Sequence, residues 1–327
     1  MLSWIPDTNH IGIYVARNKG YYAAAGLNVT VTAVAQAGAE QAVNSSLADF
    51  ALSTLTNVGI DDAKGARIAM VMQVQQKPSA IWCALASETA ITSPKDFDSK
   101  TFATFGTSES DAVVKRMIQF DGGRGIFDKV TVGTSTFQTL QSGKADFGGF
   151  YDTWEGVQSR LNGPALRCFK EADYGVPGNA DSIGIITHRD LMSRDPDLVR
   201  SFVQATQQGY AYAYAHPDEA AHILVQEAKS ANVPLDLAAA SMTKIRQEQY
   251  WGDAAAVASG HWALGTIDKK GVQQYLDFLS ASGALVDANG FTLSAAPKVD
   301  SLATNDFLDP AVQREGHEAK DSHASQG

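Results

Sequence analysis

The chain has 327 residues, which is long enough for about two domains that each bury their own core. Its net charge of −10 argues against a nucleic-acid partner, because such partners require clustered lysine and arginine. No apolar run approaches the roughly 18 residues that cross a bilayer, and the composition is that of an ordinary globular protein.

The opening residues 1–22 predict a short strand, a polar turn and a helix that ends near Gly20. Thr8 or Asn9 can cap this helix, because their side-chain oxygens accept hydrogen bonds from unpaired backbone N–H groups. Ligands of α/β proteins bind where strand ends meet helix N-termini. We therefore expect ligand contacts from Trp4, as an aromatic platform, and from Asn9 and His10. The alternatives are a buried strand tryptophan, a helix cap and a buried imidazole.

Alternation and helical periodicity predict the remaining elements in chain order. The predicted strands cover residues 27–34, 47–52, 68–74, 80–85, 101–105, 130–134 and 182–188. The predicted helices cover residues 39–47, 111–120, 136–141, about 195–214, 218–230 and 270–282.

The sequence Ala-Asp-Phe occurs twice, at residues 48–50 and 145–147. Each copy follows a helical stretch with small residues and leads into a buried strand. The repetition suggests two lobes of similar topology.

Cys83 and Cys168 lie in apolar surroundings and match neither a disulfide framework nor a zinc site. We expect two buried, unpaired thiols. The histidines show no metal-ligand spacing, so neither a metal nor another cofactor is expected.

Two later strand–helix junctions carry further candidate contacts. Thr107 and Ser108 offer hydroxyls and helix N–H groups that suit an oxyanion. Tyr151, Asp152 and Glu155 emerge where the strand after the second Ala-Asp-Phe ends, and a carboxylate there can accept a pair of N–H bonds from an aminopyrimidine. The alternative for Glu155 is a solvated glutamate at a helix start.

Residues 4–22 (WIPDTNHIGIYVARNKGYY) and 25–29 (AGLNV) resemble the opening of the NMT1/THI5-like proteins. That family includes bacterial receptors for thiamine pyrimidine precursors and a eukaryotic pyrimidine synthase. The resemblance covers about residues 2–310. It implies the type II periplasmic-binding-protein fold, with two α/β lobes joined by two crossover strands and a ligand cleft between them. We place lobe one at residues 1–84 plus 187–327 and lobe two at 85–186, with a disordered tail from about 315.

The resemblance also extends to single residues. The family's pyrimidine receptors have an aromatic-x-x-Trp-Glu pattern. The segment Tyr151 to Glu155 is similar to it, and Glu155 matches the acid of the pattern. The loop at 172–177 is similar to the family's, so Tyr174 either closes over a ligand or packs on its own loop. The synthase has a lysine where this chain has Ser53, and a histidine where it has Asn57, which we count among the ligand contacts. Its cysteine run falls near residues 178–182, which hold no cysteine.

These differences remove the amine for a Schiff base and the thiolates for iron. The chain is therefore expected to be a monomeric, non-enzymatic receptor of an ABC importer, which delivers a thiamine pyrimidine precursor to a permease. Alternatives are a receptor for riboflavin-like or sulfonate ligands and a pyrimidine synthase. The resemblance implies a periplasmic or other extracytoplasmic location, with the chain either free or tethered to the membrane. No signal peptide is recognisable at the start, which fits either a cytoplasmic protein or a trimmed mature chain.

Overall fold

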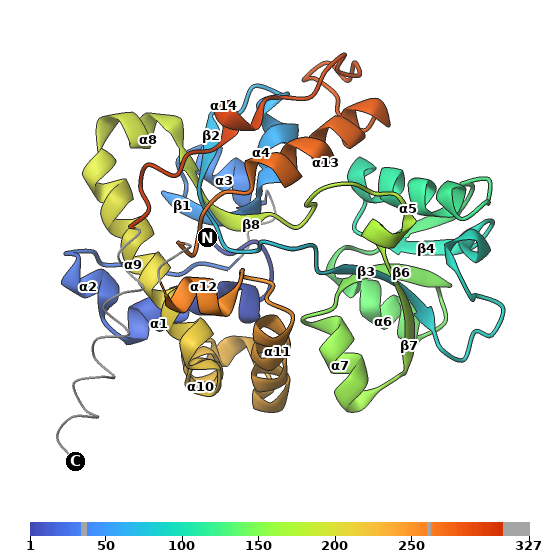
Figure 1. Ribbon diagram of the computed structural model, residues 1–327, viewed down its shortest axis with the longest axis horizontal. Helices are drawn as coiled ribbons and strands as arrows, with labels where there is room; N and C mark the ends of the chain where they lie inside the picture. The colour runs from blue at the N-terminus through green and yellow to red at the C-terminus, as the bar shows by residue number, and fades with distance from the viewer. Residues whose placement is uncertain (34–37, 260–262, 310–327) are drawn as a thin grey trace. The chain divides into compact units, whose positions relative to one another are not determined.

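The computed structural model describes residues 1–33, 38–259 and 263–309 (Figure 1). The chain forms two compact units. Unit 1 comprises Met1–Pro78, Asp181–Val272 and the chain from Pro297, and unit 2 comprises Ser79–Ala180 and Gln273–Ala296. The predicted ligand cleft between two lobes stays a prediction. The predicted tail from 315 lies outside the described residues.

The assignment of Gln273–Ala296 to unit 2 corrects the expected lobe boundaries, which placed this segment in lobe one. Hydrogen bonds explain the difference. The Tyr275 hydroxyl donates to the Glu109 carboxylate at 2.9 Å, and the Ser108 hydroxyl donates to the Ala284 carbonyl at 3.1 Å. The segment therefore packs on the helix that follows Thr107.

Unit 1 contains a three-stranded sheet in the order β1-β8-β2, with β8 antiparallel to both neighbours. Its strands are β1 (Phe50–Thr54), β8 (Ile183–His188) and β2 (Ile68–Gln73). The helices of this unit are α1 (Ile11–Asn18), α2 (Tyr21–Ala24), α3 (Ala39–Asn44), α4 (Leu55–Asp62), α8 (Arg189–Arg194), α9 (Pro196–Ala215), α10 (Pro217–Glu227), α11 (Leu235–Gln247), α12 (Ala254–Ala258) and α14 (Val299–Leu302).

Helices α1 and α9 cross at a pair of glycines. A Cβ atom added to Gly209 would lie 2.0 Å from the Gly12 carbonyl oxygen, so only glycine permits this approach. The next residue, Tyr210, is fully buried and its hydroxyl donates to the Asn9 carbonyl. Helix α9 therefore holds the turn at the start of α1.

Unit 2 contains a five-stranded sheet in the order β5-β4-β6-β3-β7. Strand β4 is parallel to β5 and β6, whereas β3 is antiparallel to β6 and β7. The strands are β3 (Ala80–Leu85), β4 (Thr101–Thr104), β5 (Asp128–Thr131), β6 (Phe147–Tyr151) and β7 (Leu166–Lys170). The helices are α5 (Ser108–Phe120), α6 (Thr136–Gln141) and α7 (Glu155–Asn162); α13 (Lys269–Ala281) begins in unit 1 and lies mainly in unit 2.

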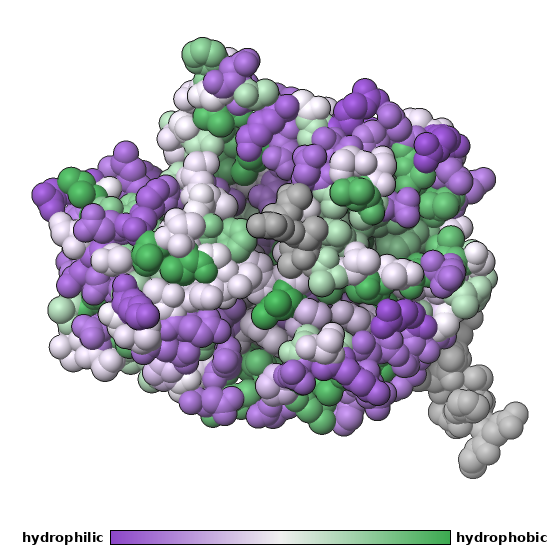
Figure 2. Space-filling model, turned by 180° about the vertical axis from the view of Figure 1, so that it is seen from behind, coloured by the Kyte–Doolittle hydropathy of each residue, from purple (hydrophilic) through white to green (hydrophobic). Residues whose placement is uncertain are grey.

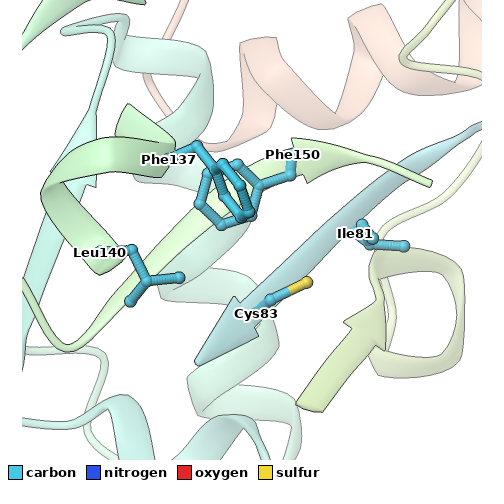
Figure 3. Close-up of a cluster of buried hydrophobic side chains, with 5 residues drawn as sticks. All are labelled: Ile81, Cys83, Phe137, Leu140 and Phe150. Carbon is cyan, nitrogen blue, oxygen red and sulfur yellow. The ribbon is translucent and has the colours of Figure 1, made fainter. Parts of the chain in front are cut away.

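The expectation of two unpaired thiols is wrong, because Cys83 and Cys168 form a disulfide. Strands β3 and β7 pair so that these two residues stand directly opposite each other. Their separation of 85 residues in sequence gave no sign of this pairing. Cys83 also belongs to a buried cluster with Phe137 and Phe150, whose rings lie 5.4 Å apart edge to face (Figure 3).

Most predicted elements are confirmed, with shifted ends. Two predicted strands are wrong: residues 3–6 form a bend, and residues 27–33 have no regular secondary structure. The helices α2, α4, α7, α8, α11, α12 and α14 and the strand β7 were not predicted.

Within the described ranges, no helix is both long and apolar enough to span a membrane. On the face shown in Figure 2, hydrophobic residues form separate patches among hydrophilic ones.

Candidate functional site

The turn before α1 is stabilised by its own polar side chains. Asp7 Oδ1 accepts a hydrogen bond from the Asn9 amide at 2.8 Å, and the Asp7 amide donates to His10 Nδ1 at 3.2 Å. His10 is fully buried, with Nδ1 3.0 Å from Asp7 Oδ1 and Nε2 3.4 Å from Ser3 Oγ. This arrangement is a capping box. The structure thus places His10 in a structural role inside the turn.

Trp4 and Asn9 are both half-buried, and they differ from His10 in this respect. The Asn9 backbone is fixed on both sides, by Asp7 and by the Tyr210 hydroxyl. Both contacts involve the Asn9 backbone and not its side-chain amide. Ile5, next to Trp4, is 53% exposed, so this bend presents apolar surface beside a rigid polar turn.

A second polar group in unit 1 lies where β1 ends and α4 begins. The side-chain amide nitrogen of Asn57 (Nδ2) donates to Glu40 Oε1 at 2.9 Å, and the Ser53 hydroxyl donates to the same oxygen. Ser53 is buried, whereas Glu40 and Asn57 are half-buried. The Thr54 hydroxyl oxygen caps α4 by accepting from the backbone N–H of Asn57 at 3.0 Å. This bond fixes the position of Asn57. We call Glu40, Ser53 and Asn57 the Glu40 cluster.

The Glu40 cluster is electrostatically acidic. Burial raises the pKa of the Asp61 carboxyl, the charge of Glu40 raises that pKa further, and Lys64 opposes both effects. Glu40 lies in the first turn of α3, where the helix dipole favours a negative charge. The cluster is therefore suited to groups that donate hydrogen bonds or carry positive charge, and it opposes anions.

In unit 2, Thr107 and Ser108 are engaged at the start of α5. Thr107 is the N-cap and its hydroxyl oxygen accepts from the Ser110 amide at 3.2 Å. The Ser108 hydroxyl donates to the Ala284 carbonyl. Both side chains are partly exposed, so they fix the junction and also line its surface.

Two side-chain contacts connect the residues after β6 to their own segment. Glu155 Oε2 accepts from the Tyr151 amide at 3.0 Å, and both residues are half-buried. Asp152 is buried and forms an ion pair with Arg160, with Oδ1 and Nη1 3.0 Å apart. Asp152 therefore supports α7 from within, whereas Glu155 and Tyr151 lie nearer the surface.

Tyr174 ends a short 3-10 helix and is half-buried. Its ring meets Phe169 edge to face, with centroids 6.0 Å apart. Burial raises the pKa of its hydroxyl, with smaller contributions from Asp121 and Asp173. In the structure the Tyr174 ring packs on Phe169 of the adjacent strand β7.

The structure thus brings some predicted residues together within each unit. Trp4, Asn9 and His10 share the turn before α1, and Tyr151, Asp152 and Glu155 share the turn before α7. Asn57 lies beside Glu40. Sequence reasoning missed Glu40, because an acid at a helix start has an ordinary capping role. The available signal was that polar residues 53 and 57 lie near the end of the first Ala-Asp-Phe strand and just beyond it.

Comparison with known proteins gives consistent relatives. A family model described as NMT1/THI5 like matches residues 7–220. A formylaminopyrimidine-binding protein of Halalkalibacterium halodurans is 28% identical over 240 residues, which is 72% of each chain. A riboflavin-binding protein, RibY, of Chloroflexus aurantiacus is 26% identical over 94% of this chain and 84% of its own. A 4-amino-5-hydroxymethyl-2-methylpyrimidine phosphate synthase of Legionella pneumophila is 21% identical over 72% of this chain and 75% of its own.

Among solved structures, the alkanesulfonate-binding protein SsuA of Xanthomonas axonopodis pv. citri matches with a TM-score of 0.69. It is 13% identical, and the match covers 93% of this chain and 96% of the other. A Candida albicans protein described as having the generic periplasmic binding protein fold matches with a TM-score of 0.62, at 17% identity over 93% and 95% of the two chains.

Proposed function

Since this chain belongs to the NMT1/THI5-like family and has the periplasmic-binding-protein fold, we propose that it is the solute-binding receptor of an ABC importer. Its ligand is a thiamine pyrimidine precursor of the formylaminopyrimidine or hydroxymethylpyrimidine type. It binds this ligand without chemical change and passes it to a membrane permease.

The Glu40 cluster is the observation that carries the proposal. An aminopyrimidine presents N–H donors in the plane of a flat ring. Ser53 and Asn57 both donate to Oε1 of Glu40, and within the described residues Oε2 is the oxygen that can accept from such a ligand. The charges of Glu40 and Asp61 oppose a sulfonate, because two anions repel each other. Trp4 offers a ring face of the kind on which a flat heterocycle stacks.

The same cluster argues against the synthase reaction. Schiff-base chemistry requires an amine, and the chain has a hydroxyl at Ser53 that donates to Glu40. Asn57 is an amide and cannot act as an acid or base in the neutral range. A carboxylate that accepts hydrogen bonds from two protein donors is suited to the recognition of a ligand.

The disulfide in unit 2 supports an extracytoplasmic location. Disulfides form and persist in oxidising compartments such as the periplasm. A receptor for an importer works in that compartment, where it meets both its ligand and the permease.

Isothermal titration calorimetry tests the ligand class. The panel contains formylaminopyrimidine, hydroxymethylpyrimidine, riboflavin and an alkanesulfonate. We expect one site per chain with tightest binding for a pyrimidine, and no change of the ligand by mass spectrometry after incubation. Binding of the sulfonate alone would refute the proposal.

Riboflavin is the second candidate, because the similarity to RibY extends over 94% of this chain. The isoalloxazine ring is also a flat nitrogen heterocycle, but it is larger than a pyrimidine. Mass spectrometry of small molecules released by denaturing the purified protein distinguishes the two. Riboflavin in that fraction, together with tighter riboflavin binding, would replace the pyrimidine as the assigned ligand.

A further inference from the structure

The dipeptide Asn-Gly occurs twice in the chain, at residues 162–163 and 289–290, and both copies lie in unit 2. Asparagine is a chemically labile residue. Glycine has no side chain, so its backbone nitrogen can approach the side-chain carbonyl carbon (Cγ) of the asparagine before it. Attack of that nitrogen on Cγ closes a succinimide ring and expels ammonia. The two copies share this chemistry, and their surroundings decide how fast each reacts.

Asn289 lies in the tip of a hairpin that follows α13. We call residues 287–291 the tip. The Asp287 amide donates to the Phe291 carbonyl at 2.9 Å across it. Residues 288–291 are all exposed. A short exposed tip of this kind opens locally at a low cost in free energy, because little apolar surface leaves the core.

The nitrogen of Gly290 is held within the same tip. Its N–H donates to the Asp287 carbonyl at 3.0 Å. A Cβ atom added to Gly290 would meet nothing within 4 Å beyond its chain neighbours, so the space around this residue is open. Local opening of the tip therefore breaks the bond to Asp287 and lets the Gly290 nitrogen turn toward Cγ of Asn289.

Asn162 has the same neighbour, but it is the last residue of α7. The Gly163 amide donates to the Ser159 carbonyl at 2.8 Å, which continues the hydrogen bonds of the helix. The Ser159 hydroxyl donates to the Pro164 carbonyl at 2.6 Å, so the chain after the dipeptide is also tied to α7. Release of the Gly163 nitrogen requires the last turn of α7 to unwind, which costs more free energy than opening the tip.

We propose that Asn289 is a modification site, at which the folded chain converts asparagine to aspartate and isoaspartate while Asn162 stays intact. The Gly290 nitrogen loses its proton and bonds to Cγ of Asn289, the Cγ–Nδ2 bond breaks, and the amide leaves as ammonia with that proton. Water then opens the succinimide at either of its carbonyl carbons. Water is the co-reactant, and no oxidant or reductant takes part. The inference concerns covalent ageing of the chain and does not rest on the proposed ligand.

Either product disturbs the hydrogen bonds of the tip. Asp287 Oδ1 accepts from the backbone amides of Asn289 and Phe291, at 2.8 Å and 2.9 Å. A new carboxylate at position 289 repels that of Asp287, and isoaspartate also lengthens the backbone of the tip by one methylene. The hairpin begins at Ala284, whose carbonyl accepts from the Ser108 hydroxyl. We therefore expect modified chains to have a less stable hairpin.

The test compares the two asparagines in one sample. The purified full chain is incubated in mildly alkaline buffer, well below its thermal midpoint, and is then digested and mapped by mass spectrometry. Loss of the amide changes the mass of the peptide, and labelling by an isoaspartyl methyltransferase identifies isoaspartate. A parallel incubation in urea removes the folded surroundings of both asparagines and measures how fast each dipeptide reacts by itself.

We expect Asn289 to convert at least about tenfold faster than Asn162 in the folded chain, and the two rates to approach each other in urea. In the Asn289→Gln variant the conversion at this position should disappear, because the longer side chain closes its ring much more slowly. Similar rates in the folded chain, or a faster rate at Asn162, would overturn the proposal. The same ratio of rates in urea would also overturn it, because the sequence alone would then set the rates.

Hydrogen exchange measures the expected loosening of the hairpin. The Leu293 amide donates to the Leu285 carbonyl at 2.9 Å, and its exchange should be faster in converted chains than in fresh ones. Exchange of the Gly163 amide in the same samples should not change. Equal exchange at Leu293 in fresh and converted chains would overturn the loosening. A ligand panel that failed to bind would overturn the proposed function alone, since neither readout uses a ligand.

Discussion

Strands β2 and β7 occupy the same place in their sheets, next to the strand antiparallel to the Ala-Asp-Phe strand, but they are held in different ways. All six residues of β2 are buried. Met70 in β2 stands opposite Ile186, and the Thr304 amide donates to the Met70 carbonyl, so a C-terminal segment covers the outer side. The matching pair in unit 2 is Cys168 and Cys83, and Cys168 is exposed.

The comparison shows that the two units stabilise this outer strand in different ways. An edge strand presents unpaired backbone groups and loses little by fraying. Unit 1 covers the strand and buries its side chains, which stabilises the strand through the hydrophobic effect. Unit 2 leaves β7 at the edge of its sheet and ties it to β3 with a covalent bond.

Removal of the disulfide is therefore expected to have the largest effect. The bond closes a loop of 85 residues, and its loss releases chain entropy in the unfolded state. We expect the variant with both Cys83→Ala and Cys168→Ala to lose about 2–5 kcal/mol in free energy of unfolding. Urea denaturation measures this loss, and hydrogen exchange should show faster opening in β7.

Reduction of the unmodified protein with dithiothreitol is the matched control, because it breaks the bond without deleting atoms from the core. Both treatments should increase exchange in β7 and leave β2 protected. Equal loss of protection in β2 would contradict the view that the two strands are stabilised separately.

Most of the fold follows from the sequence because its signals are local. The helix 136–141 was predicted with its observed ends, and the strand 80–85 likewise, since periodicity and turn residues lie within the elements. The disulfide was not predictable, because it depends on the register of β3 against a strand that sequence reasoning did not find.

The candidate site was predicted less well, because the exposure of each side chain decides whether it can contact a ligand. His10 and Asp152 belong to residue types that bind ligands, but tertiary packing buries them and pairs them with Asp7 and Arg160. Glu40 is distant in sequence from Ser53 and Asn57 and meets them only through the packing of α3 on β1 and α4.

The second prediction uses pH to test the burial of the Met1 amino group in unit 1, which donates to the Phe50 carbonyl at 2.7 Å. The pKa of the Met1 amino group falls from 8.0 to about 6 in the folded state. Between these values the unfolded chain binds more protons, so stability rises with pH. We expect the free energy of unfolding to increase by at most about 3 kcal/mol from pH 6 to pH 8 because of this group.

The chain with Gly-Ser-Gly fused ahead of Met1 is the control, because its amino group is three residues removed from the position that bonds the Phe50 carbonyl. The difference in stability between the two chains, followed by urea denaturation at each pH, isolates the contribution of Met1. A constant difference across this pH range would show that the amino group is not buried as described.

The third prediction compares the acid of unit 1 with the acid of unit 2. Glu40→Gln keeps an oxygen that accepts from Ser53 and Asn57 but presents an NH₂ donor to a donor on the ligand. Charge-assisted hydrogen bonds contribute about 1.5–3 kcal/mol, so pyrimidine affinity should fall by roughly tenfold or more. Calorimetry measures the loss, and Glu88→Gln, an exposed site with the same change of charge, should leave affinity unchanged. Equal affinity in the Glu40 variant would remove the cluster from the binding site.

The smallest effect is expected for Glu155→Gln in unit 2. Glu155 Oε2 already accepts from the Tyr151 backbone amide, so this oxygen is engaged where the sequence suggested a bidentate contact with the ligand. Its charge is also partly offset by the N-terminus of the eight-residue helix α7, whereas α3 has six residues. We expect affinity to fall by about threefold to tenfold, with a small loss of stability if glutamine holds Tyr151 less firmly. Calorimetry and thermal melting on the same samples separate the two effects. A fall larger than that of Glu40→Gln would reverse the ranking and make unit 2 the main source of ligand recognition.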